Sequence, residues 1–260
     1  MTKLSMVQRI SFSAIMLAFG IVSTMVFKMI PMGSFSFLRF SLTPSIVLFS
    51  SLTLGPFFGA VVGVFSDLVP AFILSQGAYN PFLSLAYLLL GVVPYFLYRF
   101  VSKRQKVFSS FWSVLSLFVL FFLLLVLAFY CNPSLDSAFG ENGVWLKPLI
   151  LGITAVLDVA LLALLWLLNK TKGKDPLRSE EGENVFTFAF VAGLSEFVLM
   201  TTLKSLAFYL FFLINGGGSS PFSYWYLFSM LVLGTAPSSF IDTYFLSFMI
   251  PFSKRLFVRT

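Results

Sequence analysis

The sequence predicts one all-α integral membrane domain over residues 1–260, with about eight transmembrane helices. Of the 260 residues, 58% are hydrophobic and only 10% are charged, whereas soluble domains carry about 25% charged residues. The apolar segments are about twenty residues long, which suits a bilayer-spanning helix and exceeds a β-barrel strand. Basic residues gather in the short gaps between these segments, as in the cytoplasmic loops of membrane proteins.

Helices are expected wherever apolar residues continue for about one membrane thickness. The expected ranges are 7–30, 41–54, 56–75, 81–101, 108–130, 146–169, 185–213 and 223–251. The second helix is short, and Leu54-Gly55-Pro56 predicts a tight turn into the third, because proline suits the first turn of a helix.

Four basic clusters predict the orientation of these helices. They lie at residues 3–9, 99–106, 170–178 and 254–259. Eight crossings place all four clusters on one side, which the positive-inside rule makes the cytoplasmic side. The chain is therefore expected in the plasma membrane as a multi-pass protein with both termini cytoplasmic.

Composition argues against several classes of function. The net charge of +7 comes from these topology-determining clusters, so nucleic-acid binding is not expected. The chain has no histidine and a single cysteine, Cys131, so neither a metal site nor an internal disulfide is expected. No Walker A motif or paired catalytic acids occur, and neither an enzymatic activity nor a cofactor is predicted.

The range 54–75 contains a stripe of small residues that ends in an acid. Gly55, Gly59, Gly63 and Asp67 recur every four residues, which places them along one helix face. Such a face allows another helix backbone to approach closely. An acid inside a membrane helix marks a polar site or pathway by default.

A substrate-binding site is predicted in the outer half of the membrane, where both signs of charge and several aromatic rings are expected to gather. Its candidate residues are Arg39, Asp67, Tyr79, Lys204 and Trp225, with Glu196 nearer the midplane. The alternative is that the charges only pair with one another or reach the interface, and that the aromatic residues form an interfacial belt. Asp158 and Asp242 are weaker candidates.

Two further alanines suggest a packing surface on the first helix. Ala14 and Ala18 form a small-xxx-small pair, which indicates close packing against another helix.

Several of these motifs together resemble the substrate-binding S components of energy-coupling factor (ECF) vitamin transporters. The resemblance is carried by Phe37-Leu38-Arg39-Phe40, Pro44, the run from Leu54 to Gly63, and Asp67-Leu68. The run Gly77-Ala78-Tyr79-Asn80-Pro81 is similar to the folate-type branch, and Ala14-x-x-x-Ala18 is similar to the motif that docks the coupling subunit. The resemblance implies a six-helix core in two parts, 1–104 and 185–260. Residues 105–184 are then an inserted helical pair with a cytoplasmic linker.

The resemblance also implies a function. The chain would bind a vitamin, most simply folate or a related anionic heterocycle, and would assemble with a transmembrane coupling subunit and two ATPase subunits. The main alternative is a stand-alone secondary transporter, which needs internal symmetry and ion-coupling residues. A lipid-modifying membrane enzyme and a purely structural subunit are further alternatives.

Overall fold

The computed structural model describes the backbone of residues 5–29, 42–74, 79–104, 108, 110–130, 143–172, 185–216, 223–232 and 235–258. Within these ranges the chain is helical and contains no strand. The helices are α1 (Met6–Met29), α2 (Thr43–Leu54), α3 (Pro56–Leu74), α4 (Pro81–Lys103), α6 (Phe111–Tyr130), α8 (Gly143–Lys172), α9 (Val185–Ser195), the π-helix η4 (Glu196–Leu203), α10 (Lys204–Asn215), α11 (Tyr224–Val232) and α12 (Thr235–Val258).

The fold class predicted from the sequence is confirmed. Among the described residues, six helical segments are long and apolar enough to cross a membrane: Met6–Val26, Pro56–Ile73, Pro81–Lys103, Phe111–Tyr130, Lys147–Lys170 and Val185–Asn215. The last of these runs through α9, η4 and α10. At 1.5 Å per residue, the twelve-residue α2 is only about 18 Å long and does not span the bilayer by itself.

The predicted helix over 223–251 is wrong as a single element. The structure has two helices there, α11 and α12, and residues 233–234 between them lie outside the described ranges. The physical reason is Pro237, in the first turn of α12. Proline has no backbone N–H and its ring clashes with the preceding turn, so the first turn of a helix accommodates it most easily, although Pro70 and Pro94 lie inside α3 and α4.

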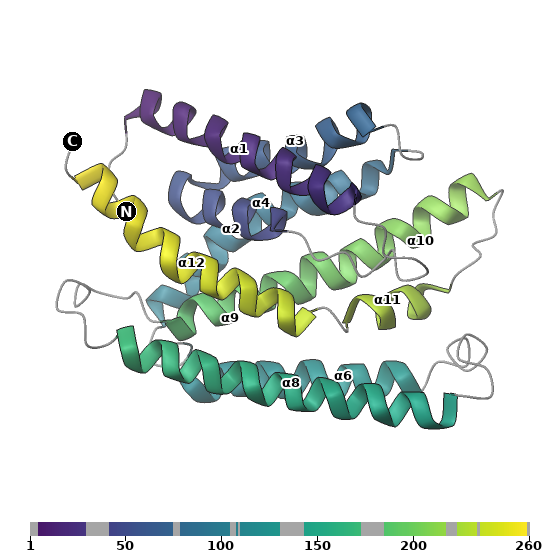
Figure 1. Ribbon diagram of the computed structural model, residues 1–260. Helices are drawn as coiled ribbons and strands as arrows, with labels where there is room; N and C mark the ends of the chain where they lie inside the picture. Colours follow the sequence, from purple (N-terminus) through teal and green to yellow (C-terminus); the bar gives the residue numbers. More distant parts are fainter. Residues whose placement is uncertain are drawn as a thin grey trace.

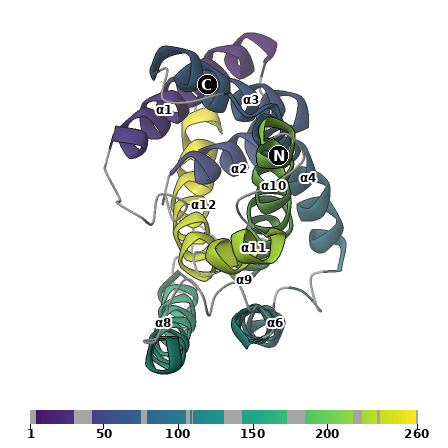
Figure 2. The same cartoon turned by 90° about the vertical axis from the view of Figure 1, so that its right-hand side faces the viewer.

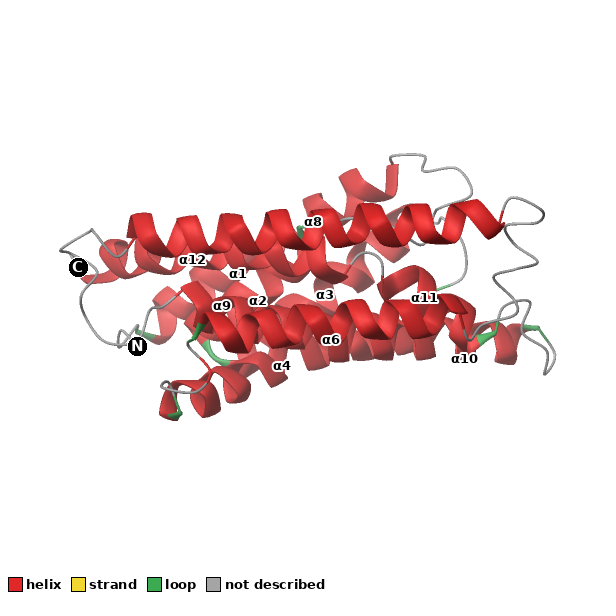
Figure 3. Cartoon of the chain, turned by 90° about the horizontal axis from the view of Figure 1, so that it is seen from below, coloured by secondary structure: helices red, strands yellow, loops and turns green. Residues whose placement is uncertain are grey.

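The helices form three groups across the molecule (Figures 1 and 2). Helices α1–α4 pack together on one side, and α9, η4, α10 and α12 pack against them. On the other side of α9 and α12 lie α6 and α8, which run side by side along the length of the bundle (Figure 3). The start of α1 and the end of α12 lie on the same side of the molecule (Figure 1).

Helices α3 and α4 touch through their backbones, as the glycine stripe predicts. A methyl group built on Gly59 would overlap the carbonyl oxygen of Gly91, and one built on Gly63 would overlap the carbonyl oxygen of Tyr87. Gly55 lies outside this contact. It follows α2 with φ of 103°, a left-handed conformation that glycine adopts without strain. The chain thereby turns directly into α3.

Helix α2 forms the centre of the first group. It contacts α1, α3, α4 and α12, and ten of its twelve residues are buried. Val47, Leu48 and Phe49 are fully buried in the largest apolar cluster of the described residues. A helix that is buried on all faces is typical of the interior of a large bundle.

Candidate polar site

Asp67 is the last residue of the glycine stripe on α3, and its side chain is hydrogen-bonded to a residue of α4. Its side chain is 4% exposed, and its Oδ2 accepts a hydrogen bond of 2.6 Å from the Ser84 hydroxyl. The Ser84 oxygen in turn accepts a hydrogen bond of 2.8 Å from the Tyr79 hydroxyl. Two of the predicted site residues, Asp67 and Tyr79, are therefore joined through a serine that the sequence reasoning did not select.

A second part of the site lies where η4 meets α12 and α2. The carboxyl groups of Glu196 and Asp242 lie near enough to interact electrostatically, and the Ser45 hydroxyl donates to Oδ1 of Asp242. Both acids are buried, with exposed fractions of 4% and 2%. One oxygen of each, Oε1 of Glu196 and Oδ2 of Asp242, has no hydrogen-bond partner among the described residues.

Electrostatic interactions connect these two parts. Tyr87 on α4 is buried and interacts with both Asp67 and Glu196. Lys204, the first residue of α10, interacts with Glu196. We call the whole set the polar cluster: Ser45, Asp67, Ser84, Tyr87, Glu196, Lys204 and Asp242.

The π-helix η4 positions two members of the polar cluster, Glu196 and Lys204. Its wider turn is visible in the side chains too, since the Thr202 hydroxyl donates to the carbonyl oxygen of Phe197, five residues earlier. Glu196 begins the π-helix and Lys204 follows its end. π-helical turns inside α-helices occur frequently at functional sites, and here the wider turn coincides with the two charged residues of the span Val185–Asn215.

Two predicted site residues remain, Arg39 and Trp225. Arg39 lies outside the described residues. Trp225, on α11, is 61% exposed and packs edge-on against Tyr224 and Phe228. No described contact joins it to the polar cluster.

Sequence reasoning underestimated Asp242 and did not select Ser45, Ser84 or Tyr87. Ser84, Tyr87 and Gly91 lie three to four residues apart on one face of α4, and this spacing could have identified Ser84 and Tyr87. Across the contact they pair with Asp67, Gly63 and Gly59 of α3, respectively. Ser45 and Asp242 are far apart in the sequence, and no local pattern pairs them.

Asp158 lies in a separate environment on α8. It is buried on the stripe that also carries Leu151 and Leu161, which belong to apolar clusters on α6 and its neighbours. Its Oδ1 has no partner among the described residues. Asp158 therefore interrupts an apolar contact between helices and is not part of the polar cluster.

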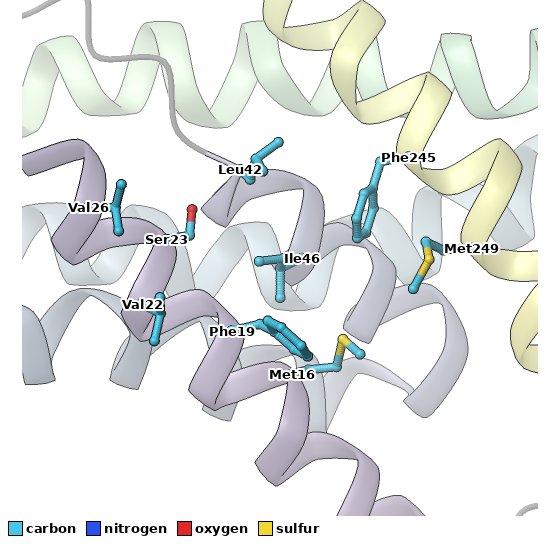
Figure 4. Close-up of a pocket in the computed structure, with 9 residues that line it drawn as sticks. All are labelled: Met16, Phe19, Val22, Ser23, Val26, Leu42, Ile46, Phe245 and Met249. Carbon is cyan, nitrogen blue, oxygen red and sulfur yellow. The ribbon is translucent and has the colours of Figure 1, made fainter.

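A pocket of about 360 Å³ opens between α1, α2 and α12 (Figure 4). Eight of the nine residues that line it have apolar side chains, and Ser23 is the ninth. Phe19 and Val22, on α1, line it and are exposed on the outside of the bundle. Such a lining does not select a polar solute, so the pocket is distinct from the polar cluster.

Ala14 and Ala18 are exposed on the face of α1 that also carries Val22. They contribute nothing to the buried core, so an interaction of this face with a partner helix is sterically open. Whether a partner helix packs on this face stays a prediction.

The polar cluster is rich in hydrogen-bond acceptors. Its three carboxyl groups and its hydroxyl groups suit a ligand that donates hydrogen bonds, while Lys204 supplies donors. Among the described residues, no three Asp, Glu or Cys side chains are grouped in a way that could hold a metal ion.

Comparison with protein families places the chain beside a transporter family. The family model described as ECF-type riboflavin transporter, S component, matches residues 4–172. The matched residues include α1 to α4 and continue through α6 and α8, ending before α9. No curated protein and no solved structure matches the chain.

Proposed function

Because the chain belongs to the family of ECF-type riboflavin transporter S components, we propose that it captures a vitamin with a flat heterocyclic ring at the polar cluster. The family membership makes the chain a substrate-binding membrane subunit for vitamin uptake. Such a subunit has no catalytic reaction of its own and depends on partners for energy. We infer that these partners are a transmembrane coupling subunit and two ATPase subunits, and that both termini face the cytoplasm.

The charge of the polar cluster favours an uncharged vitamin. Among the described residues of the cluster, Asp67, Glu196 and Asp242 supply three carboxyl groups, and Lys204 is a cation that interacts with Glu196. A carboxylated solute would face this excess of acids, and like charges in a poorly solvated site repel strongly. Riboflavin is uncharged and rich in hydroxyl and ring N–H donors, so it fits the acceptors better. This charge balance is the observation that carries the choice of solute.

A folate-like anion is the second candidate. It is favoured by Lys204 together with Arg39, because charge-assisted hydrogen bonds to a carboxylate are among the stronger polar contacts. If an anionic tail bound there, removing either cation would leave the tail unpaired.

Direct binding distinguishes the two solutes. The purified chain in detergent is titrated into riboflavin and into folate, with binding followed by calorimetry and by quenching of flavin fluorescence. We expect riboflavin to bind and folate neither to bind nor to compete. Folate binding with no riboflavin binding would overturn the choice of solute.

Substitutions then test the place of the site. Losing a charge-assisted contact costs about 1.5–3 kcal/mol, which corresponds to roughly ten- to a hundredfold in affinity. Lys204→Ala is expected to weaken binding in that range, and Lys172→Ala, at the end of α8, is the matched control. Equal affinities of the two variants would place the solute elsewhere.

We further propose that the groups of helices have separate roles. Helices α9 and α12 pack directly against α2 and α4, whereas α6 and α8 lie outside them. This arrangement supports a six-helix binding core formed by 1–104 and 185–260, with residues 105–184 as a peripheral pair, although the family model also covers this pair as far as residue 172. Deleting 105–184 and joining the flanking ends with a short linker is expected to preserve solute binding. Loss of binding in a monodisperse deletion variant would argue against this division.

Energy dependence separates this function from a stand-alone transporter. Vesicles that contain only this chain are expected to bind solute in proportion to the protein and to accumulate none. Uptake against a gradient, driven only by protons or sodium ions, would support the secondary transporter instead.

A further inference from the structure

The apolar pocket of Figure 4 lies in a gap between α1 and α12. Helix α1 packs against α2 and α3, and α12 packs against α2 and α9, with no comparable contact between α1 and α12 among the described residues. Met16 and Ile46 form the floor of the pocket, with exposed fractions of 5% and 6%. Phe19, Val22 and Val26 form its mouth on α1 and are 50–60% exposed. The pocket is therefore closed by buried side chains and open along α1.

The medium outside this mouth is the hydrocarbon of the bilayer. The segment Met6–Val26 is long and apolar enough to cross a membrane, and it contains every residue of the mouth. An empty pocket forfeits the van der Waals contacts of its lining, whereas a polar solute inside it would lose its hydrogen bonds. A hydrocarbon chain avoids both costs, and lipids supply such chains at the mouth itself.

The dimensions of the pocket suit a single chain. The α1 residues that line it extend from Met16 to Val26, which corresponds to about 15 Å at 1.5 Å per residue. A volume of about 360 Å³ spread over this length gives a mean cross-section of about 24 Å², or about 5 Å across. Carbon atoms in van der Waals contact lie about 3.5–4.0 Å apart. One hydrocarbon chain therefore fits, and two side by side do not.

Ser23 supplies a hydrogen-bond donor at one end of the pocket. Its Oγ is buried and has no hydrogen-bond partner among the described residues. Figure 4 shows Ser23 toward the end that carries Val26 and Leu42. Val26 is the last residue of the apolar segment, so this end lies near the boundary between hydrocarbon and headgroups. The ester groups of glycerophospholipids lie at this depth, and a hydroxyl group donates readily to a carbonyl oxygen.

We propose that this pocket is a lipid site, which takes one acyl chain of a diacyl glycerophospholipid and binds the ester carbonyl of that chain through the Ser23 hydroxyl. The chain fills the gap between α1 and α12 and covers Ile46 of α2. The site is separate from the polar cluster and does not depend on which vitamin the protein binds.

The ester contact is tested by native mass spectrometry of the full-length protein, delipidated in detergent and titrated with dioleoyl phosphatidylglycerol. The matched probe is the diether analogue, which has the same chains and headgroup but no ester carbonyl. The first diester lipid is expected to bind roughly two- to tenfold more tightly than the first diether lipid, as one neutral hydrogen bond allows. Ser23→Ala is expected to lower the diester affinity to that of the diether and to leave the diether affinity unchanged. Equal affinities of the wild type for the two lipids would overturn the ester contact.

Filling the pocket tests where the chain lies. Ile46→Phe places a ring into the pocket from its floor and is expected to weaken binding of the first lipid about tenfold or more, whereas Ile46→Leu keeps the side-chain volume and the lipid. Val26→Phe narrows the mouth without touching the core, and Val7→Phe, elsewhere on α1, is its control. Size-exclusion chromatography checks that each variant is monodisperse. Wild-type lipid affinity in both filling variants, or displacement of the lipid by riboflavin, would overturn the lipid site.

Discussion

The contact between α3 and α4 makes a sharp prediction about Gly91. A Cβ at this position would lie closer than 3.0 Å to the backbone carbonyl group of Gly59 and to the nitrogen of Ala60, a separation that real Cβ atoms essentially never show. No flexible side chain is there to move aside. The two helices must therefore separate until the contact reaches 3.4 Å or more, which is ordinary van der Waals distance.

The cost of Gly91→Ala follows from this geometry. Overpacking a well-packed interface typically costs 1–3 kcal/mol, and we expect the upper end, about 3 kcal/mol, because backbone meets backbone. The separation also loosens Ser84 from Asp67, about two turns further along the same face. The melting temperature of the purified protein is expected to fall by about 6–12 °C, at roughly 2–4 °C per kcal/mol.

Gly152 supplies the matched control. It is also a helical glycine, but a Cβ at this position on α8 would meet nothing within 4 Å. Ala is favoured over Gly inside a helix by about 0.5–1 kcal/mol, so Gly152→Ala is expected to be neutral or slightly stabilising. Both variants are measured by tryptophan fluorescence melting in the same detergent. Equal melting temperatures for the two variants would refute the backbone contact between α3 and α4.

Three other changes test separate contacts. Ser84→Ala removes the donor to Asp67 and is expected to cost about 1–3 kcal/mol of stability; a melting curve like that of the wild type would show that the carboxylate finds another donor. Asn80→Ala removes the side-chain cap of α4 and a hydrogen bond to a carbonyl group of α10, so a loss of about 1–2 kcal/mol is expected in the same melting assay. Ala14→Leu combined with Ala18→Leu is expected to abolish uptake by the assembled transporter and to leave solute binding by the isolated chain unchanged; loss of binding as well would place these residues in the fold instead of a docking surface.

Much of the fold is predictable because its signals are local. Pro56 and Pro81 begin α3 and α4, as expected for proline in a first helical turn. Apolar length alone identifies the long spans. The face shared by Gly59 and Gly63 predicts a close helix contact, although not which helix makes it.

The polar site is less predictable because its partners are distant in the sequence. Ser45 and Asp242 are 197 residues apart. The π-helix at Glu196 has no local sequence rule of comparable strength. Its wider turn depends on the helices packed around it, so a regular helix is expected from the sequence alone.

The short α2 has a consequence for how the protein enters the membrane. It is too short to cross the bilayer and carries five hydroxyl side chains: Thr43, Ser45, Ser50, Ser51 and Thr53. Some of these bond back to its own carbonyl groups, as Ser50 does to Ile46. The translocon releases a segment into the bilayer according to its hydrophobicity, and α2 alone is too short and too polar to be released efficiently. The tight turn at Gly55 ties it to the apolar α3, so we expect the two to be inserted as one hairpin, and α2 to reach its buried position only when the later helix α12 closes over it.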